Sequence, residues 1–386
     1  MKQGWEIKKL GNVCEELFAG GDVPKVNSSK VESDIFNVPI FSNGEKNKGL
    51  YGYTNVARVI KPSITISARG TIGYSEIRES AFYPAIRLIV VIPKTEILDL
   101  FFLKYVISSI DFTHSGSSIP QLTVPMIKEY PIPLPPLPEQ QRIVAILEEA
   151  FEAIATAKAN AEQNLKNAKE LFESYLMGVF ENPKDNWEKK KWGDLCQFVR
   201  GPFGGSLKKS IFKEDGYVVY EQKHAIHDHF NQLRYFIDED KFNEMIRFEV
   251  KPGDIIMSCS GVTLGRVAII PENIRRGIIN QALLKLTPKK NVSVHFLKHW
   301  LRSKIFQDII FEYSGGAAIP NVPSAKILKD ILIPLPSLKE QNKIVENIEL
   351  ILVETKRLES IYKHKIVVLE ELKKSVLQKA FNGELN

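Results

Sequence analysis

Residues 131–148 read PIPLPPLPEQQRIVAILE, and residues 332–349 read LIPLPSLKEQNKIVENIE. The same proline-rich phrase therefore occurs twice in one chain, far apart. An internal repeat has to be recognised before a fold is inferred, because missing it assigns the wrong fold. The distance between the copies is the size of a domain, so the phrase predicts a duplicated domain and not a solenoid of short repeats.

The repeat extends outward from this phrase in both directions. The matching segments are GWEIKKLGNVC with NWEKKKWGDLC, ARGTIGYSEI with SGVTLGRVAI, FLKYVISSI with FLKHWLRSK, and HSGSSIPQL with SGGAAIPNV. They follow the same order in each half, whereas the stretches between them differ, as FSNGEKNKGLYGY and YVVYEQKHAIHDH illustrate. Equal frames with unlike inserts indicate two modules that each recognise something different.

Each module is predicted to be a mixed α/β domain of the α+β class with a twisted sheet. β-branched runs such as SITIS and RLIVVI alternate with helical stretches such as LFFLKYVISSI. The duplication predicts that the two modules are related by a pseudo-twofold rotation. The expected divisions are module one at 1–137, a first helical region at 138–182, module two at 183–336 and a second helical region at 337–386.

A long helix is predicted after each proline-rich phrase. Proline fixes φ and lacks an N–H, so PLPPLP is extended, and Pro138 suits the first turn of a helix. In the second copy, Ser337 and Glu340 fit a capping box. Each helix then runs without proline to a stop signal, at residues 182–183 and at residues 382–383.

Both helices carry apolar residues at alternating spacings of four and three, the seam of a coiled coil. Since the first helix leaves module one and the second leaves module two, an intramolecular pair must be antiparallel. The two chain ends should then lie close together. The same symmetry places Asn164 opposite Thr355, which predicts a polar contact that fixes the register. Two alternatives remain: these side chains face water or bond their own helix, or the seam joins separate molecules.

Composition is that of a folded, mildly basic protein. The net charge of +6 permits a nucleic-acid partner. No apolar run is long enough for a membrane span, and the first residues lack the apolar core of a signal peptide. Three cysteines suit a reducing cytosol, so we expect a cytoplasmic protein, with Cys14 and Cys196 as equivalent buried thiols.

Catalytic motifs are absent from the sequence. No phosphate-binding loop and no Asn/Asp-Pro-Pro-Tyr/Phe tetrapeptide of an adenine methyltransferase occurs. The HAIHDH stretch lacks cysteine partners and has no counterpart in module one, so we assign no metal site and interpret it as a polar loop. E-x-K triplets occur without the additional carboxylate that a nuclease site requires.

The ordered, duplicated motifs resemble the specificity subunit of type I restriction–modification enzymes over the whole chain. WEIKKLGNV and WEKKKWGDL, the TIG and TLG turns, and the two proline-rich phrases carry this resemblance. It implies a non-catalytic protein with two target recognition domains that read double-stranded DNA, and no cofactor in this chain. It also implies two methyltransferase subunits that bind S-adenosylmethionine, and motor–nuclease subunits that use ATP and Mg²⁺.

Unlike inserts imply unlike half-sites, so we expect an asymmetric, split DNA target. The predicted DNA contacts are polar and basic residues of the inserts and turns: Asn43, Lys46, Lys48, Arg69, Thr71, Ser117, Ser118, Lys208, Lys209, His224, Arg234, Ser260, Thr263 and Arg266. The Thr-x-Gly turns are equally consistent with plain hairpin geometry. Two alternatives stay open: an interaction scaffold without a DNA role, and a self-sufficient methyltransferase or nuclease.

Overall fold

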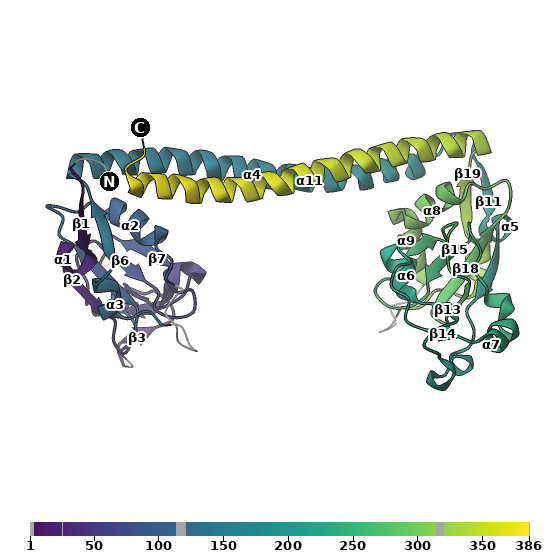
Figure 1. Ribbon diagram of the computed structural model, residues 1–386, viewed down its shortest axis with the longest axis horizontal. Coiled ribbons are helices and arrows are strands. Elements are labelled where there is room, and N and C mark those ends of the chain that lie inside the picture. Colours follow the sequence, from purple (N-terminus) through teal and green to yellow (C-terminus); the bar gives the residue numbers. More distant parts are fainter. Residues whose placement is uncertain (1–3, 25, 113–120, 314–319, 386) are drawn as a thin grey trace. The chain divides into compact units, whose positions relative to one another are not determined.

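In the computed structural model, each proline-rich phrase leads from a short strand into a 45-residue helix (Figure 1). These helices are α4 (Leu137–Glu181) and α11 (Leu338–Asn382). The structure describes residues 4–24, 26–112, 121–313 and 320–385. None of the helices in these ranges combines the length and the apolar composition that a membrane span requires.

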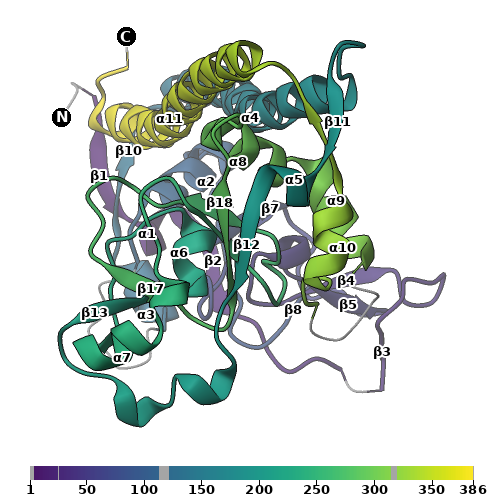
Figure 2. The same ribbon diagram turned by 90° about the vertical axis from the view of Figure 1, so that its right-hand side faces the viewer.

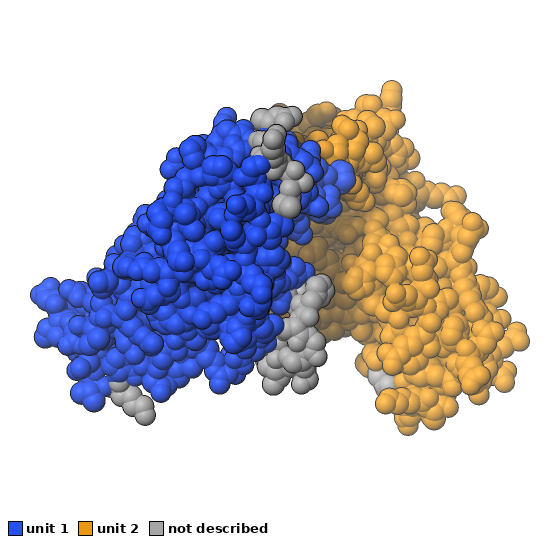
Figure 3. Space-filling view, turned by 60° about the vertical axis from the view of Figure 1, so that its left-hand side comes forward, with its two compact units in different colours: residues 1–162, 363–386 blue, residues 163–362 orange. Residues whose placement is uncertain are grey.

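The chain folds as two compact units, which Figure 3 colours separately: unit 1 is residues 1–162 with 363–386, and unit 2 is residues 163–362. Besides its parts of α4 and α11, unit 1 contains β1 (Glu6–Lys9), α1 (Leu10–Val13), β2 (Cys14–Ala19), β3 (Ser28–Ser29), β4 (Val38–Phe41), η1 (Lys46–Gly49), β5 (Leu50–Thr54), β6 (Ser63–Ile66), β7 (Ser75–Arg78), β8 (Tyr83–Pro84), β9 (Ile89–Pro93), α2 (Leu100–Ser109), α3 (Val124–Lys128) and β10 (Pro131–Leu134).

Unit 2 follows a similar order of strands with additional short helices between them, and Figure 2 turns its elements toward the viewer. Its elements are β11 (Glu188–Lys191), α5 (Trp192–Leu195), β12 (Cys196–Arg200), η2 (Gly204–Ser206), η3 (Lys209–Ile211), β13 (Tyr217–Tyr220), α6 (Gln222–His227), β14 (Phe236–Ile237), α7 (Glu239–Glu244), η4 (Ile246–Phe248), β15 (Ile255–Ser258), β16 (Val267–Ile269), β17 (Gly277–Ile279), β18 (Leu283–Pro288), α8 (Val294–Arg302), α9 (Lys304–Tyr313), α10 (Ala325–Asp330) and β19 (Leu332–Leu335).

The larger antiparallel sheets of the two units have the same strand order, whereas the second sheet has four strands (β3-β5-β4-β8) in unit 1 and three (β14-β13-β17) in unit 2. The four-stranded antiparallel sheet is β2-β9-β6-β7 in unit 1 and β12-β18-β15-β16 in unit 2. A second sheet in each unit contains one parallel pair, β4 with β8 or β13 with β17. A two-stranded ribbon, β1-β10 or β11-β19, precedes each long helix. The predicted mixed α/β fold and its duplication are confirmed.

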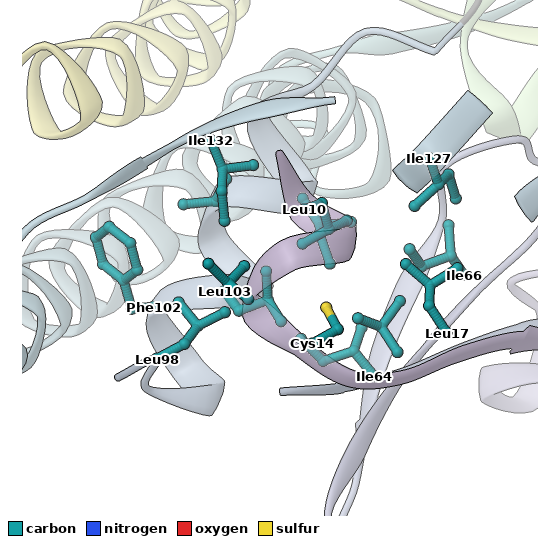
Figure 4. Close-up of a cluster of buried hydrophobic side chains, with 14 of the residues drawn as sticks. Leu10, Cys14, Leu17, Ile64, Ile66, Leu98, Phe102, Leu103, Ile127 and Ile132 are labelled. Atoms are coloured by element: carbon teal, nitrogen blue, oxygen red, sulfur yellow. The ribbon is translucent and has the colours of Figure 1, made fainter. Parts of the chain in front are cut away.

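The core of unit 1 draws on both long helices. Figure 4 shows its centre, where Leu10, Cys14 and Ile64 lie among other apolar side chains. From α4, Ile143 enters this core, and from α11, Ala380 does so. Burial raises the pKa of the Cys14 thiol to about 12, and it does the same for Cys196 in unit 2 and for Cys259. The predicted pair of equivalent buried thiols is confirmed.

The core of unit 2 is built in the same way. Leu176 and Phe180 from α4 and Ile348 from α11 are buried together with Trp192 and Phe296. The ring of Phe180 meets that of Phe296 edge-on, with centroids 5.6 Å apart. Each module therefore completes its core with the far end of the long helix that begins at the other module: residues 363–386 of α11 in unit 1 and residues 163–181 of α4 in unit 2.

Within unit 1 the two helices run antiparallel, as predicted. Arg142 donates to the carbonyl of Leu385 at 3.0 Å, and farther along α4 Lys158 pairs with Glu370 at 2.7 Å. The chain ends meet in this unit, because Trp5 belongs to the same core as the helix end and Leu385 packs against it.

The predicted contact between Asn164 and Thr355 is wrong. Asn164 is exposed, whereas Thr355 is buried and its hydroxyl donates to the carbonyl of Leu352 on its own helix at 3.0 Å. The symmetry of the repeat gave the direction of the helices but not their register, because side-chain packing sets the register. Threonine satisfies its own hydroxyl within a helix readily.

A buried glutamine explains why the proline-rich phrase occurs twice. Gln140 accepts from the N–H of Asp99 at 2.8 Å and donates to the carbonyls of Ile97 and Pro135. In unit 2, Gln341 accepts from the N–H of Ser293 at 2.8 Å and donates to the carbonyl of Pro336. Each glutamine thus ties the first turn of a long helix to the loop before helix α2 or α8.

Replacing Gln140 by leucine should lower the free energy of unfolding by about 2–3 kcal/mol, because the N–H of Asp99 and the carbonyls of Ile97 and Pro135 lose their buried partner. The matched control is Gln141→Leu, which changes the exposed neighbouring glutamine and should stay within about 0.5 kcal/mol. Chemical denaturation measures both. Equal effects of the two substitutions would contradict the role of Gln140.

Candidate nucleic-acid interface

Three loops of module one meet around the side chain of Asn43. Its amide donates to the carbonyl of Ile86 at 3.0 Å and accepts from the N–H of Ala68 at 2.7 Å. The next residue, Gly44, donates its N–H to Ser67 Oγ at 2.9 Å. Both ends of the Asn43 amide bind backbone, so Asn43 holds the loops together, and its contact with DNA stays a prediction.

Two arginines project beside this junction and share one acceptor. Arg69 Nη2 and Arg87 Nη1 donate to the same oxygen, Oε1 of Gln121, at 2.9 and 3.0 Å. Both arginine side chains are exposed, and Gln121 is half-buried. Arg87 has a φ of 66°, in the left-handed region that non-glycine residues rarely adopt. Arg69 was a predicted contact, whereas sequence reasoning missed Arg87.

The buried side chain of Arg78 binds the backbone of the loop that carries Lys46 and Lys48. Both lysines are exposed, and Lys48 has a φ of 52°. Arg78 donates from Nη2 to the carbonyl of Lys48 at 2.5 Å and from Nε to Thr65 Oγ1 at 3.1 Å. Its guanidinium carbon lies 3.5 Å from the centroid of the Phe41 ring, and burial lowers its pKa. Arg78 therefore fixes the shape of the loop, and the lysines remain predicted contacts.

The first Thr-x-Gly turn presents Thr71 to solvent. Gly70 and Gly73, on either side, have φ values of 72° and 83°, so the turn requires glycine. The carbonyl of Thr71 accepts from the N–H of Tyr74 at 3.1 Å, which closes the turn. Hairpin geometry accounts for the glycines and leaves the threonine hydroxyl available. Ser117 and Ser118 lie outside the described residues.

The second Thr-x-Gly turn is held in the same way. Gln222 donates to the carbonyl of Ser260 at 2.6 Å, and its Oε1 accepts from the Ser260 hydroxyl at 3.3 Å. Ser258 donates its hydroxyl to the carbonyl of Thr263 and accepts from the N–H of Arg266 at 3.0 Å. The hydroxyl of Ser260 is therefore engaged within the chain, Thr263 is half-buried, and Arg266 is exposed.

The remaining basic predictions in module two are on the surface. Lys208 and Lys209 are exposed at the start of η3. Arg234 is exposed, with its guanidinium carbon 4.8 Å from the centroid of the Tyr235 ring. Like Lys46 and Arg266, these side chains are exposed, and they stay predicted contacts.

His224 is a correction to the predicted interface. Its ring is fully buried, and Nδ1 accepts from the N–H of Glu221 at 2.9 Å while Nε2 lies 3.2 Å from the carbonyl of Gln232. It forms a capping box with Glu221 at the start of α6. Burial lowers the pKa of His224. The histidine is therefore a structural residue that a DNA groove cannot reach.

The rest of the HAIHDH stretch is anchored to helix α8. Asp228 adopts a φ of 55° and forms ion pairs with Lys298 at 2.7 Å and with Arg302 at 2.9 Å. Within the described part of the chain, no three histidine, cysteine or acidic side chains are grouped so that they could hold a metal ion. The carboxylate of this stretch thus serves to fasten the loop to the module.

Comparison with known proteins identifies the family. The family model described as "Type I restriction modification DNA specificity domain" matches residues 2–167 and 184–363. The type I specificity subunit S.MpnORF89P of Mycoplasma pneumoniae is 35% identical over 46% of this chain and 53% of its own length. The EcoBI specificity subunit of Escherichia coli is 25% identical over 72% of this chain and 63% of its own length. The chain spans about half the length of S.MpnORF89P and of a second Mycoplasma pneumoniae relative, S.MpnORF507P.

Solved structures share the fold at low sequence identity. The HsdS subunit from Thermoanaerobacter tengcongensis superposes with a TM-score of 0.69 at 20% identity, covering 100% of this chain and 98% of that one. A chain from a study of complex assembly and conformational transition of the type I R-M system gives a TM-score of 0.72 at 21% identity, covering 100% and 99%. The whole chain therefore has the fold of these proteins.

Two buried histidines should make the chain less stable in mild acid. Burial lowers the pKa of His224, and burial also lowers that of His299, whose Nε2 lies 3.0 Å from Glu349. Below the unfolded-state pKa of about 6.5, the unfolded chain binds more protons, so stability is full above that pH and falls below it. Each histidine contributes a slope of up to about 1.4 kcal/mol per pH unit.

Unfolding free energies measured between pH 7.5 and 5.0 test this expectation. His224→Leu and His299→Leu should each flatten the pH dependence below 6.5, although both also lower stability at neutral pH. The slope, and not the absolute value, is the quantity to compare. A slope that neither substitution changes would mean that other groups govern the acid sensitivity.

Proposed function

The chain belongs to the type I restriction modification DNA specificity family, and on this premise we propose that it is the subunit that selects the DNA site. Each module reads one half of a split, asymmetric target in double-stranded DNA. The observation that carries the proposal is that two modules with the same order of strands in their antiparallel sheet present unlike loops at equivalent places. A common frame with unlike loops suits one mode of binding applied to two different sequences.

Exposed basic side chains in these loops supply the attraction to DNA. Lys46 and Lys48 in module one, and Lys208, Lys209 and Arg266 in module two, are exposed. Basic contacts to phosphates position a protein on the duplex without reading its sequence, and contacts to base edges then give the specificity. In this proposal the loops carry both kinds of contact, and the sheets carry neither.

Catalysis is proposed to belong to partner subunits. Two methyltransferase subunits would supply S-adenosylmethionine-dependent methylation, and motor–nuclease subunits would use ATP and Mg²⁺, so this chain would need no cofactor of its own. The long helices expose apolar side chains that a partner can cover, including Leu350 and Val353 in unit 2 and Leu372 in unit 1. Three buried cysteines agree with a cytoplasmic location.

Selection from a DNA library tests the proposal directly. Purified chain, with its methyltransferase subunits where these are needed for binding, is incubated with duplexes that carry two randomised segments separated by a variable spacer. Enrichment of one split, asymmetric motif supports the proposal. Absence of any enriched motif, with the subunits present, would favour an interaction scaffold without a DNA role.

Exchanging one module should change one half-site only. Replacing residues 186–330 with the equivalent segment of a relative alters the loops of module two and leaves the loops of module one as they are. The same library should then return a motif with one new half and one unchanged half. A folded chimera that loses selectivity for both halves would contradict modular reading.

Lengthening both helices should lengthen the spacer between the half-sites. One added heptad in α4 and one in α11 lengthens each helix by about 10 Å at 1.5 Å per residue. At about 3.4 Å per base pair, the preferred spacer should grow by roughly 3 base pairs. A control with the heptad in α4 alone breaks the pairing and should destabilise the chain. An unchanged spacer in the double insertion would show that another feature sets the separation.

A further inference from the structure

Module one contains a pair of arginines that module two lacks at equivalent positions. The equivalence follows from backbone contacts: Gly20 donates to the carbonyl of Leu88 at 2.7 Å, and Gly201 donates to the carbonyl of Leu283 at 2.9 Å. Leu88 and Leu283 therefore occupy equivalent positions, and so do the residues that precede them in the sequence. Arg87 in module one therefore stands where Ala282 stands in module two.

The position of the second arginine follows in the same way. Asn43 and Gln222 each come just after a matching strand, β4 or β13, and each binds the backbone of a Thr-x-Gly turn, at Ala68 or at Ser260. The residue after Ala68 is Arg69, and the residue after Ser260 is Gly261. The frame is thus shared by the two modules, while the two guanidinium groups occur in module one alone.

Arg69 and Arg87 have more N–H donors than their contact with Gln121 uses. Each guanidinium has five N–H groups, and the described residues provide Arg69 and Arg87 with one side-chain acceptor in common, the amide oxygen of Gln121. No carboxylate among the described residues forms an ion pair with either group. Two exposed cations held together by a neutral amide favour a ligand with several acceptor atoms.

We propose that Arg69 and Arg87 read a guanine in the half-site of module one, an inference that rests on the proposed function. Guanine presents two acceptors, O6 and N7, at its major-groove edge, and an arginine binds both at once. Gln121 is a positioning residue that holds the two guanidinium groups side by side. Asn43 is a second positioning residue, because it joins the turn of Arg69 to the loop of Arg87.

A guanine explains the arrangement better than a phosphate does. Phosphates are alike along every sequence, so a phosphate contact would be useful to both modules at this place, yet module two has Gly261 and Ala282. The backbone of Arg87 also keeps a left-handed φ of 66°, and such local strain persists where the surrounding structure holds it. A residue held in this way is suited to a contact of fixed geometry.

The experiment uses the split duplex that the wild-type complex selects from the library. Each guanine of the first half-site is replaced in turn by 7-deazaguanine, which lacks the N7 acceptor. At one position the replacement should weaken binding of the wild type by about 3- to 10-fold, because it removes one of the two hydrogen bonds of a bidentate contact. The same replacement should weaken binding of Arg69→Ala or Arg87→Ala much less, because the partner of N7 is already gone.

Two further variants separate reading of a base from attraction to charge. Arg87→Lys keeps the positive charge but loses the planar fork, so the preference for guanine should weaken while the salt dependence of binding stays. Gln121→Leu should weaken the same preference by loosening the pair. Arg58→Ala removes another exposed arginine of module one, which lies beside Gly21 and does not contact Gln121, and it should leave the base preference unchanged. Module two is unchanged in all these variants. Retained selectivity for the second half-site therefore serves as the control that each variant is folded.

The outcomes separate this inference from the function on which it rests. If the wild-type complex selects no split motif, the proposed function fails. If it selects one and no guanine of the first half-site depends on Arg69 or Arg87, the inference is overturned and the function stands. A uniform loss of affinity across sequences, with the salt slope lowered by about one, would assign the pair to a phosphate and would also overturn the inference.

Discussion

The apolar seam of each long helix is the constraint on which the rest of the structure depends. Helices of this length carry exposed polar faces, and most of the stability of such a helix comes from burying its apolar face. Here the modules bury part of that face. Ile143 and Ala380 lie in the core of unit 1, and Leu176, Phe180 and Ile348 lie in the core of unit 2. Neither core is complete without a segment from each helix.

This sharing of side chains explains why the proline-rich phrase is repeated so closely. Each helix must leave its module at a defined angle if its apolar face is to enter the core. The extended prolines set the approach, and Gln140 or Gln341 then fixes the first turn through three backbone groups. A change in this phrase would alter the path of 45 residues, whereas a change in a surface loop alters only that loop.

The sequence predicted the duplicated frame because the residues that build it are constrained by backbone geometry. Prolines, turn glycines and the β-branched runs appear in the same order in both halves and have the same structural role in both. The register of the helices could not be predicted, because it depends on how side chains of different size pack, and Asn164 proved to be exposed. The internal repeat therefore predicts the relative direction of the two helices, but it does not predict how deeply an individual side chain is buried.

The residues predicted to contact DNA fall into two groups: those whose side chains hydrogen-bond the backbone of the fold, and those whose side chains are exposed. Asn43 and His224 were chosen because they are polar and lie in divergent inserts, but their side chains satisfy backbone groups. Nothing in the sequence distinguishes an amide that faces inward from one that faces DNA. Arg87 was missed for the opposite reason, since it directly precedes an apolar strand and belongs to no motif.

The inward-facing amides make the outward-facing arginines replaceable. Asn43 in module one and Gln222 in module two hold equivalent turns, Asn43 by accepting from the N–H of Ala68 and Gln222 by donating to the carbonyl of Ser260, although one turn carries Arg69 and the other carries Gly261. The stability of the turn therefore does not depend on the residue that it presents. An exposed arginine can be exchanged for glycine or alanine at such a place with little effect on the core, because its side chain is not part of the core. A module built in this way can acquire a new recognition sequence while its sheets, its core and its attachment to the long helices stay as they are.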